Sequence, residues 1–541
     1  MHDALTTPNL RGPVRDPSGP AEFAHPAAPP GAWRLPTILA AMALYLAAMA
    51  VMRLALSTSL NWDDSEQMLF SQRLAWGYDL DQPPLYTWLL MGVQFALGLT
   101  PAAGLAFNYG LWLLTVALFY VCAHRILGDA EHAALATLAL LSLNTIGWTM
   151  HETLTHTMLL MACCAAGLWA FLALVDRGGL LDYLLFGAVL GAGVLSKYNF
   201  LGFLICLFGA AALQPALRER LLRREMLLSL SLALAVVSPH LLWVWSEIHH
   251  REVLTLYRTV AKLSPNESWA ARALRGLVSL PAPIVGFLSP LLVVTAALIP
   301  GAFRPRPRPR PAPDLGGKPD LVRLIRDMLL IGVLLLLLGV LAGAVGWYRE
   351  IWLHPFLLFA PIYLMARIQW ARPPARRRRL FIAALLLYPL AVFAARGAHL
   401  ILGPPVCWSP CLDRAPLDQM ATRLSASGFS RGTIIGSDLY IAGNLRMRFP
   451  ASRVVSGHKP FFEPPRRQEP GQCLIVWEQA GVDTGPPAHA ISYASLAPGQ
   501  APTAYSIERL AIPWGLPFPR GKDFVTKWAY IMLPEGSGRC S

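Results

Sequence analysis

The chain has 541 residues, of which 55% are hydrophobic and only 14% charged, and its formal net charge is +14. Apolar runs of about 16–25 residues recur along it, the length needed to cross a bilayer core about 30 Å thick, so the composition excludes a soluble globular protein and indicates a polytopic α-helical membrane protein. The arginines stand in short clusters between these runs, as in cytoplasmic loops, and we therefore expect no nucleic-acid partner.

Residues 1–34 are rich in Pro and Ala and lack the apolar core and cleavage site of a signal peptide, so we expect a disordered cytoplasmic tail. A transmembrane domain in contact with membrane lipids follows over residues 35–396. Its twelve candidate spans lie near residues 35–55, 84–100, 103–123, 133–150, 156–175, 181–195, 199–214, 226–246, 275–299, 328–346, 351–366 and 380–395.

The basic clusters at 218–224, 304–310 and 376–379 are separated by two candidates each, so they share one side, which the positive-inside rule makes cytoplasmic. The basic N-terminus should also be cytoplasmic. Counting candidate spans back to it gives one too many, so one of the candidates cannot cross the membrane. The weakest is 84–100, which we expect to form a juxtamembrane helix, leaving about eleven spans. The ionisable segments discussed below then all lie on the extracytoplasmic face of the inner membrane.

Residues 61–90 follow the first span and are too polar to cross a bilayer. Acids are scarce elsewhere in the chain, but five of them fall within nineteen residues here: Asp63, Asp64, Glu66, Asp79 and Asp81. Tryptophans and tyrosines interleave with these acids. This composition is typical of a segment at the membrane-water interface with its carboxylates turned toward water.

The same stretch resembles a known family. An acidic pair after the first span, a short helix ending in LAWGY, a PP-L-x-x-W continuation and the motif LSKYN at 195–199 are similar to bacterial polyprenyl-phosphate-sugar glycosyltransferases of the GT-C fold, relatives of protein O-mannosyltransferases and lipid A aminoarabinose transferases. The resemblance covers roughly residues 36–396. It implies an integral membrane transferase that moves a hexose or pentose, with inversion, from a polyprenyl-phosphate donor to a hydroxyl of an envelope lipid, glycan or protein.

Such a transfer needs a base for the acceptor proton, stabilisation of positive charge at the anomeric carbon, and cations for the departing phosphate. By the family pattern the first acid of the pair, Asp63, is the base. Asp64, Glu66 and Glu152 are the other catalytic candidates. An alternative is that Asp63 is the N-cap of a helix reaching Trp76, with Glu66 completing a capping box.

Glu152 and His156 are four residues apart in MHETLTHTMLL, which would place them one above the other on a helix face. The pair could bind a divalent cation or the acceptor, or it could hydrogen-bond neighbouring spans. Many relatives carry an acid about where Thr157 stands, so this chain departs from the pattern and a metal cofactor stays unknown.

Lys197 sits between two apolar runs, where an ionisable group is costly without a partner, and a lipid phosphate would be such a partner. The alternative is an exposed lysine that reaches the interface. Arginine suits phosphate through its fork of donors. The further substrate-binding candidates are Asp81, Gln82, His156, Tyr198, Arg251, Arg258, Arg349 and His354.

Residues 397–541 change character and predict a soluble extracytoplasmic α/β domain. Short β-type runs at 432–436, 453–456, 474–477 and 528–533 alternate with a helical stretch near 416–427. Cys407, Cys411, Cys473 and Cys540 lie here, on the oxidising side, and an even number suggests one or two disulfides. A CxxxC metal pair is the weaker interpretation, since no second ligand pair follows at metal spacing.

A lipid or solute transporter is the alternative function. It should show internal repeats with Gly/Pro-interrupted spans in matching halves and charges at mid-membrane. We find no such pairing in the sequence.

Overall fold

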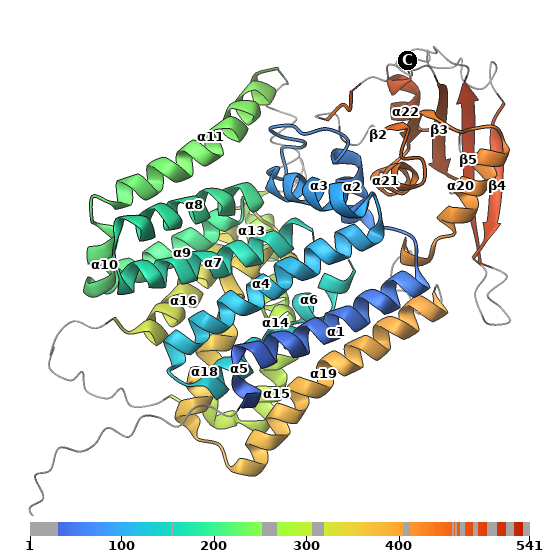
Figure 1. Ribbon diagram of the computed structural model, residues 1–541. Coiled ribbons are helices and arrows are strands. Elements are labelled where there is room, and N and C mark those ends of the chain that lie inside the picture. Colours follow the sequence, from blue (N-terminus) through green and yellow to red (C-terminus); the bar gives the residue numbers. More distant parts are fainter. Residues whose placement is uncertain are drawn as a thin grey trace, which may run out of the picture.

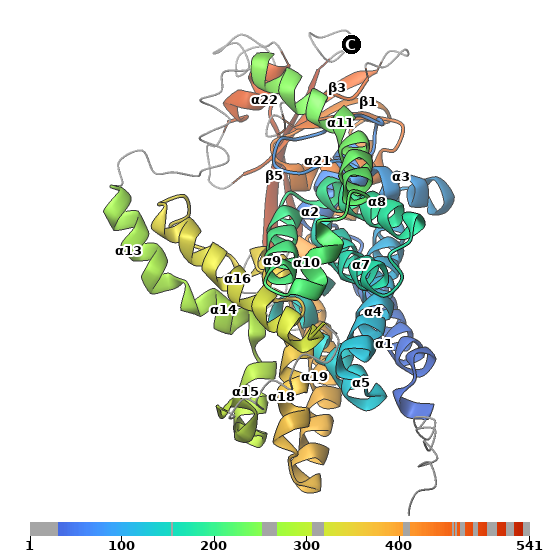
Figure 2. The same cartoon turned by 90° about the vertical axis from the view of Figure 1, so that its left-hand side faces the viewer.

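The computed structural model describes residues 31–152, 155–250, 268–305, 319–403, 412–456, 459, 462–465, 471–479, 485–494, 506–514 and 524–533. Its helices form a bundle, and a small sheet domain lies at one end of that bundle (Figures 1 and 2). The basic beginning of α19 (Ala375–Leu402) lies at the opposite end (Figure 1).

Among the described residues, seven helical stretches are long and apolar enough to cross a membrane. They are α1 (Leu35–Leu56), α4 (Pro101–Leu127), α7 (His156–Asp176), α11 (Met226–His250), the continuous pair α13 (Trp269–Ser279) and α14 (Pro281–Leu288), α16 (Leu321–Leu341) and α19. The expected architecture of a polytopic helical membrane protein with a terminal α/β domain is confirmed.

Shorter helices fill the bundle between these stretches. They are α2 (Trp62–Phe70), α3 (Leu85–Leu97), α5 (Ala130–Leu138), α6 (Asn144–Gly147), α8 (Leu180–Ser196), α9 (Phe200–Ala212), α10 (Pro215–Leu221), α15 (Leu291–Leu298), α17 (His354–Leu357) and α18 (Ala360–Ala371), with the 3-10 turns η3 (Thr149–His151), η5 (Glu350–Trp352) and η7 (Leu412–Arg414). At 1.5 Å per residue α3 is about 20 Å long, which is shorter than a bilayer core.

Two of the candidate spans are interrupted at prolines. The segment 275–299 divides into α13, α14 and α15, and Pro281 and Pro290 stand at the two breaks. The segment 351–366 divides into η5, α17 and α18, with prolines in the first turn of the last two. Proline lacks the N–H that a helix interior uses, so the first turn of a helix, where that N–H has no partner in the helix, is the position that accepts it most readily.

Helix α7 is the centre of the bundle, because 89% of the residues in its most apolar stretch are buried. It packs against α4, α8 and α9, and the run of small residues from Ala162 to Gly167 lets these neighbours approach closely. At Gly167 a side chain would clash with Phe203 of α9. This packing fixes the N-terminal end of α7, where His156 stands.

The sheet domain contains five strands in the order β2-β1-β3-β5-β4. Strands β1 (Gly432–Gly436), β2 (Arg453–Ser456) and β3 (Gln472–Glu478) are parallel, while β5 (Val525–Leu533) runs antiparallel to β3 and to β4 (Glu508–Pro513). Three helices accompany them, α20 (Leu417–Ala426), α21 (Leu439–Arg448) and α22 (Ala488–Tyr493). The four predicted strands and the predicted helix are confirmed, whereas β4 and α21 were not foreseen.

The structure shows where α19 ends before the sheet domain, and it describes one of the four cysteines that follow. Helix α19 continues to Leu402, past the expected domain boundary at residue 396. Cys473 is disulfide-bonded, in agreement with the disulfide prediction. Cys407, Cys411 and Cys540 lie outside the described residues.

The acidic helix α2 is built into the sheet domain. Leu69 and Phe70 belong to the same apolar core as Leu417 and Ile434 of the domain. Helix α21 lies so close to α2 that a Cβ atom on Gly443 would stand 2.1 Å from the Ser65 carbonyl oxygen.

The next residue of α21 fixes the register of this contact. The Asn444 side chain accepts from the backbone N–H of Leu60 (2.9 Å) and donates to the Leu60 carbonyl (3.2 Å). A side-chain amide that pairs with both backbone groups of one residue holds the segment before α2 in a single position.

Replacing Gly443 by alanine should therefore separate α21 from α2. Because backbone atoms cannot move aside like a flexible side chain, we expect the folded state to lose about 1–3 kcal/mol, the usual cost of overpacking. Thermal unfolding of the purified full chain measures this, with Gly485→Ala as the matched control because no atom lies within 4 Å of its added Cβ. Equal unfolding temperatures for the two variants would contradict the prediction.

Candidate active site

The acidic helix begins after Asn61, whose side chain accepts a hydrogen bond from the Trp62 backbone N–H. The alternative in which Asp63 is the N-cap of a helix reaching Trp76 is therefore wrong, and α2 ends at Phe70. The two aspartates instead occupy the first turn of α2. There the positive end of the helix dipole favours their carboxylates.

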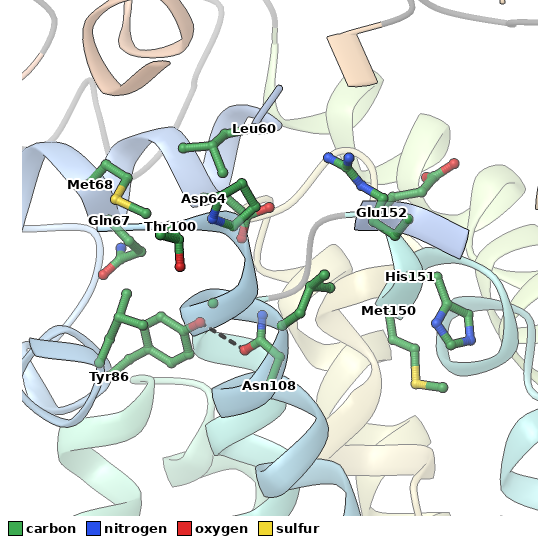
Figure 3. Close-up of a pocket in the computed structure, with 15 residues that line it drawn as sticks. Leu60, Asp64, Gln67, Met68, Tyr86, Thr100, Asn108, Met150, His151 and Glu152 are labelled. Atoms are coloured by element: carbon green, nitrogen blue, oxygen red, sulfur yellow. Dashed lines mark hydrogen bonds between the residues drawn. The ribbon is translucent and has the colours of Figure 1, made fainter. Parts of the chain in front are cut away.

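Asp63 and Asp64 face different surroundings. Asp63 is exposed, whereas Asp64 lines a cavity together with Arg53, Asn108 and Glu152 (Figure 3). Burial, reinforced by the neighbouring charge of Asp63, raises the pKa of Asp64 to about 7. Asp63 is thus the exposed acid of the pair, and Asp64 holds its proton more readily than an ordinary aspartate.

A chain of charges holds Glu152. Its carboxylate pairs with Arg396 of α19 (2.5 Å), Arg396 pairs with Asp413 (3.2 Å), and Asp413 pairs with Arg53 of α1 (3.4 Å). Asp413 belongs to η7, which leads into the sheet domain. The chain therefore ties α1, α19 and the sheet domain to the cavity beside Asp64.

The expected pair of Glu152 and His156 on one helix face is wrong. Helix α7 begins only at His156, and Glu152 follows the separate turn η3. His156 Nδ1 donates to the Ser196 carbonyl (3.3 Å), and Nε2 accepts from the Gln67 side-chain amide (3.2 Å). Both ring nitrogens are occupied, so His156 links α2, α7 and α8 rather than binding a metal or acceptor with Glu152.

Lys197 lies between α8 and α9, and its ammonium donates to the Thr157 hydroxyl (3.0 Å). Burial lowers the pKa of Lys197, the negative charge of Asp63 opposes this, and the positive charge of Arg349 adds to it. No carboxylate among the described residues is paired with Lys197, so its charge is available to an anionic ligand.

Tyr198 and Gln82 have different environments. The Tyr198 hydroxyl donates to His240 Nε2 (2.7 Å), and His240 Nδ1 donates to the Trp76 carbonyl (2.8 Å), so Tyr198 fastens the acidic segment to α11. Gln82 has a buried side-chain oxygen that accepts no hydrogen bond from the residues that the structure describes. Such an acceptor costs about 1–3 kcal/mol unless a ligand donates to it. Asp81, beside it, is exposed.

The structure places the remaining candidates as follows. Arg349 is exposed, and its positive charge acts on Lys197. His354 is fully buried, with Nδ1 donating to the Ile351 carbonyl (2.9 Å) and Nε2 accepting from the Thr145 hydroxyl (3.3 Å). Both of its nitrogens therefore serve the packing around α17, and substrate binding by His354 stays a prediction that these contacts do not favour. Arg251 and Arg258 lie outside the described residues.

The sequence analysis missed one cation, Lys459, which comes from the sheet domain. Its ammonium pairs with Glu66 (2.6 Å) and with Asp79. Burial raises the pKa of Glu66 to about 7, although the positive charge of Lys459 opposes the shift. Burial alone would lower the pKa of Lys459, but the two carboxylates outweigh it and raise that pKa. No local signal marks Lys459, since its partners lie some 380 residues earlier.

Among the residues that the structure describes, no three His, Cys, Asp or Glu side chains gather in a way that could hold a metal ion. The exposed carboxylate of Asp63 and the cation Arg349 both act electrostatically on Lys197. A carboxylate can take a proton from a hydroxyl, and cations can stabilise a departing phosphate. The arrangement therefore fits group transfer from a phosphate to a hydroxyl.

Known proteins resemble this chain in sequence. Residues 81–243 match the family described as dolichyl-phosphate-mannose-protein mannosyltransferase. The lipopolysaccharide core galacturonosyltransferase RgtA of Rhizobium johnstonii is 30% identical over 455 residues, which cover 83% of this chain and 88% of that protein. The lipopolysaccharide core galacturonosyltransferase RgtB of the same organism is 29% identical over 463 residues, which cover 83% of this chain and 89% of that protein.

Solved structures agree on the fold. ArnT from Cupriavidus metallidurans bound to undecaprenyl phosphate superposes with a TM-score of 0.58, at 13% identity, over 91% of this chain and 97% of that one. The apo form of the same protein gives a TM-score of 0.55 at 14% identity, over 91% and 98%.

Proposed function

We propose that this chain, which belongs to the polyprenyl-phosphate-sugar glycosyltransferases with the GT-C fold, transfers a hexuronic acid such as galacturonic acid to a glycolipid of the cell envelope. The observation that carries the choice of sugar and acceptor is the 30% identity with RgtA over most of both chains, because that protein is named for these two substrates. The transporter alternative is not supported, since the matching relatives are glycosyltransferases.

The residues of the site can take up both the proton and the negative charge that the transfer step releases. The acceptor oxygen attacks the anomeric carbon from the face opposite the phosphate, so the new C–O bond inverts the configuration. Asp63 accepts the proton of the acceptor hydroxyl. The bond between the anomeric carbon and the phosphate oxygen breaks, and its electron pair leaves with the polyprenyl phosphate, which Lys197 and Arg349 stabilise.

Composition of the envelope glycolipid in a deletion strain tests the sugar and the acceptor together. We expect uronic acid to disappear from the lipopolysaccharide core and to return when the parent gene is restored, but not with a gene carrying Asp63→Asn. Purified protein should then use polyprenyl-phosphate galacturonate in preference to the corresponding mannose donor. An unchanged core glycan, or loss of a neutral sugar, would show that the proposed substrate is wrong.

We further propose that the site faces the extracytoplasmic side. The supporting observation is that the basic beginning of α19 lies at the end of the bundle away from α2 and the sheet domain (Figure 1), and basic ends face the cytoplasm. The chain would then consist of a cytoplasmic tail (1–34), a transmembrane catalytic domain (35–396) and an extracytoplasmic domain (397–541).

Single cysteines in a cysteine-free background test this orientation with an impermeant thiol reagent. A cysteine replacing Asn61 should be labelled in intact cells, while one replacing Arg308 should be labelled only after permeabilisation. Labelling at 308 together with protection at 61 would reverse the orientation.

A further inference from the structure

We propose that the sheet domain is a working part of the active site, because it supplies Lys459 as the positioning residue that holds Glu66 and Asp79 together beside Asp63. The inference rests on the proposed function only in that its test measures sugar transfer. It assigns a role to a domain that the transfer chemistry itself does not require.

The backbone around Lys459 is fixed by the sheet. Its N–H donates to the carbonyl of Ser456 at the end of β2 (3.2 Å), and its own carbonyl accepts from the N–H of Phe462 (3.3 Å). The Phe462 ring packs edge-on against Phe70 of α2, with ring centroids 5.5 Å apart, and against Tyr78 at 5.3 Å. The position of the ammonium is therefore set by β2 and by the aromatic residues of the acidic segment.

The ammonium satisfies two acids that would otherwise repel each other. Glu66 comes from α2 and Asp79 from the segment after it, and Lys459 pairs with both. The face of Phe70 lies 5.8 Å from the same nitrogen, at cation–π distance. Breaking a largely buried ion pair of this kind leaves uncompensated charge, so without Lys459 the two carboxylates would repel each other and move apart.

The acidic segment also covers the free edge of the sheet. Strand β2 is an edge strand, and the Gln72 side chain bonds both of its exposed backbone groups at Val454, accepting from the N–H (2.9 Å) and donating to the carbonyl (2.7 Å). An uncovered edge would be open to other chains. Together with the α21 contact to α2, this makes the domain and the acids one unit.

The charges around Glu66 predict how Lys459 affects its ionisation. The charged groups that act on Glu66 are Lys459, Asp63 and Asp79, and Glu66 in turn acts on Lys197. Burial and the two aspartates favour the protonated form of Glu66, and Lys459 is the cation that opposes them. Removing the cation should raise the pKa of Glu66 further, so Glu66 would lose its charge at a higher pH.

The test is the pH dependence of transfer by the purified full chain, added to membranes of the deletion strain. These membranes supply the native donor and acceptor, so the assay does not depend on which sugar is moved. We expect Lys459→Met to shift the acidic limb of the pH profile upward by about 1–3 pH units, the effect of losing an opposite charge at contact distance. Lys459→Arg should restore the parental profile.

Matched variants test whether Lys459 acts through Glu66 or only attaches the sheet domain to α2. Lys527→Met makes the same change on an exposed side chain of β5 and should leave the profile unchanged. In a Glu66→Gln background, Lys459→Met should no longer move the acidic limb. A parental profile for Lys459→Met, or an equal loss of rate at every pH, would overturn the proposal. In the deletion strain, loss of a sugar other than uronic acid would refute only the proposed substrate and not the role of Lys459.

Discussion

Asp63→Asn should lower the turnover of sugar transfer by about 10²–10⁴-fold, the contribution typical of general base catalysis. The variant keeps the size of the side chain and most of its hydrogen bonding but cannot take the acceptor proton. Donor binding should survive, because Asp63 is exposed at the first turn of α2 and the cations Lys197 and Arg349 remain. The measurement pairs a transfer assay with binding of a polyprenyl-phosphate analogue to the same preparation.

Two further variants make the Asp63 result specific. Asp176→Asn, at the end of α7, removes only an exposed ion pair with Arg125 and should leave the rate within about twofold, since such pairs contribute roughly 0–1 kcal/mol. Asp64→Asn tests the other acid of the pair, which faces the cavity. If Asp63→Asn transfers sugar at the parental rate while Asp64→Asn does not, the base is Asp64 and the proposed role of Asp63 is wrong.

The acidic segment could be identified from the sequence because acids are rare in this chain. Five of them between Asp63 and Asp81 indicated a functional segment. The structure packs that segment against the sheet domain, and the charges of Asp63 and Glu66 act on Lys197. Lys197 was visible for the same reason, as an isolated cation between apolar runs. Scarcity of a residue type is a signal that one sequence can supply.

The partners of these acids could not be found in the same way. Lys459 and Asp413 are single charged residues in a domain that contains many, and their contacts with Glu66 and Arg53 join segments more than 350 residues apart. Arg396 is almost fully buried, yet in sequence it resembles a flanking arginine at the end of a span. Such contacts follow from tertiary packing, which local pattern does not encode.

Helix α21 shows why some elements escape pattern reading. Gly443 and Asn444 both lower helix propensity, so the stretch does not look helical. The structure needs these two residues, because Gly443 admits the backbone of Ser65 and Asn444 bonds Leu60. The residues that hide the helix are the ones that attach it to α2.

Lys197→Ala should weaken binding of the donor rather than the chemical step. Loss of a charge-assisted hydrogen bond to phosphate costs about 1.5–3 kcal/mol, which corresponds to roughly 10–150-fold weaker binding. The reason is that no carboxylate among the described residues is paired with this ammonium, so the charge is available to an anionic ligand. Transfer should therefore recover when the donor concentration is raised, unlike transfer by Asp63→Asn.

Binding of undecaprenyl phosphate to the purified variants measures the Lys197 effect directly. Lys527→Ala removes an exposed lysine of β5 and should bind like the parent, while Lys197→Arg keeps the charge and should retain most of the affinity. Lys197→Ala and Lys197→Met both lose the charge and the hydrogen bond to the Thr157 hydroxyl, but Lys197→Met keeps most of the side-chain volume. Equal loss of affinity in the two variants would therefore show that side-chain volume is not the cause. Parental affinity in Lys197→Ala would show that the phosphate is held by other cations, with Arg349 as the first to examine.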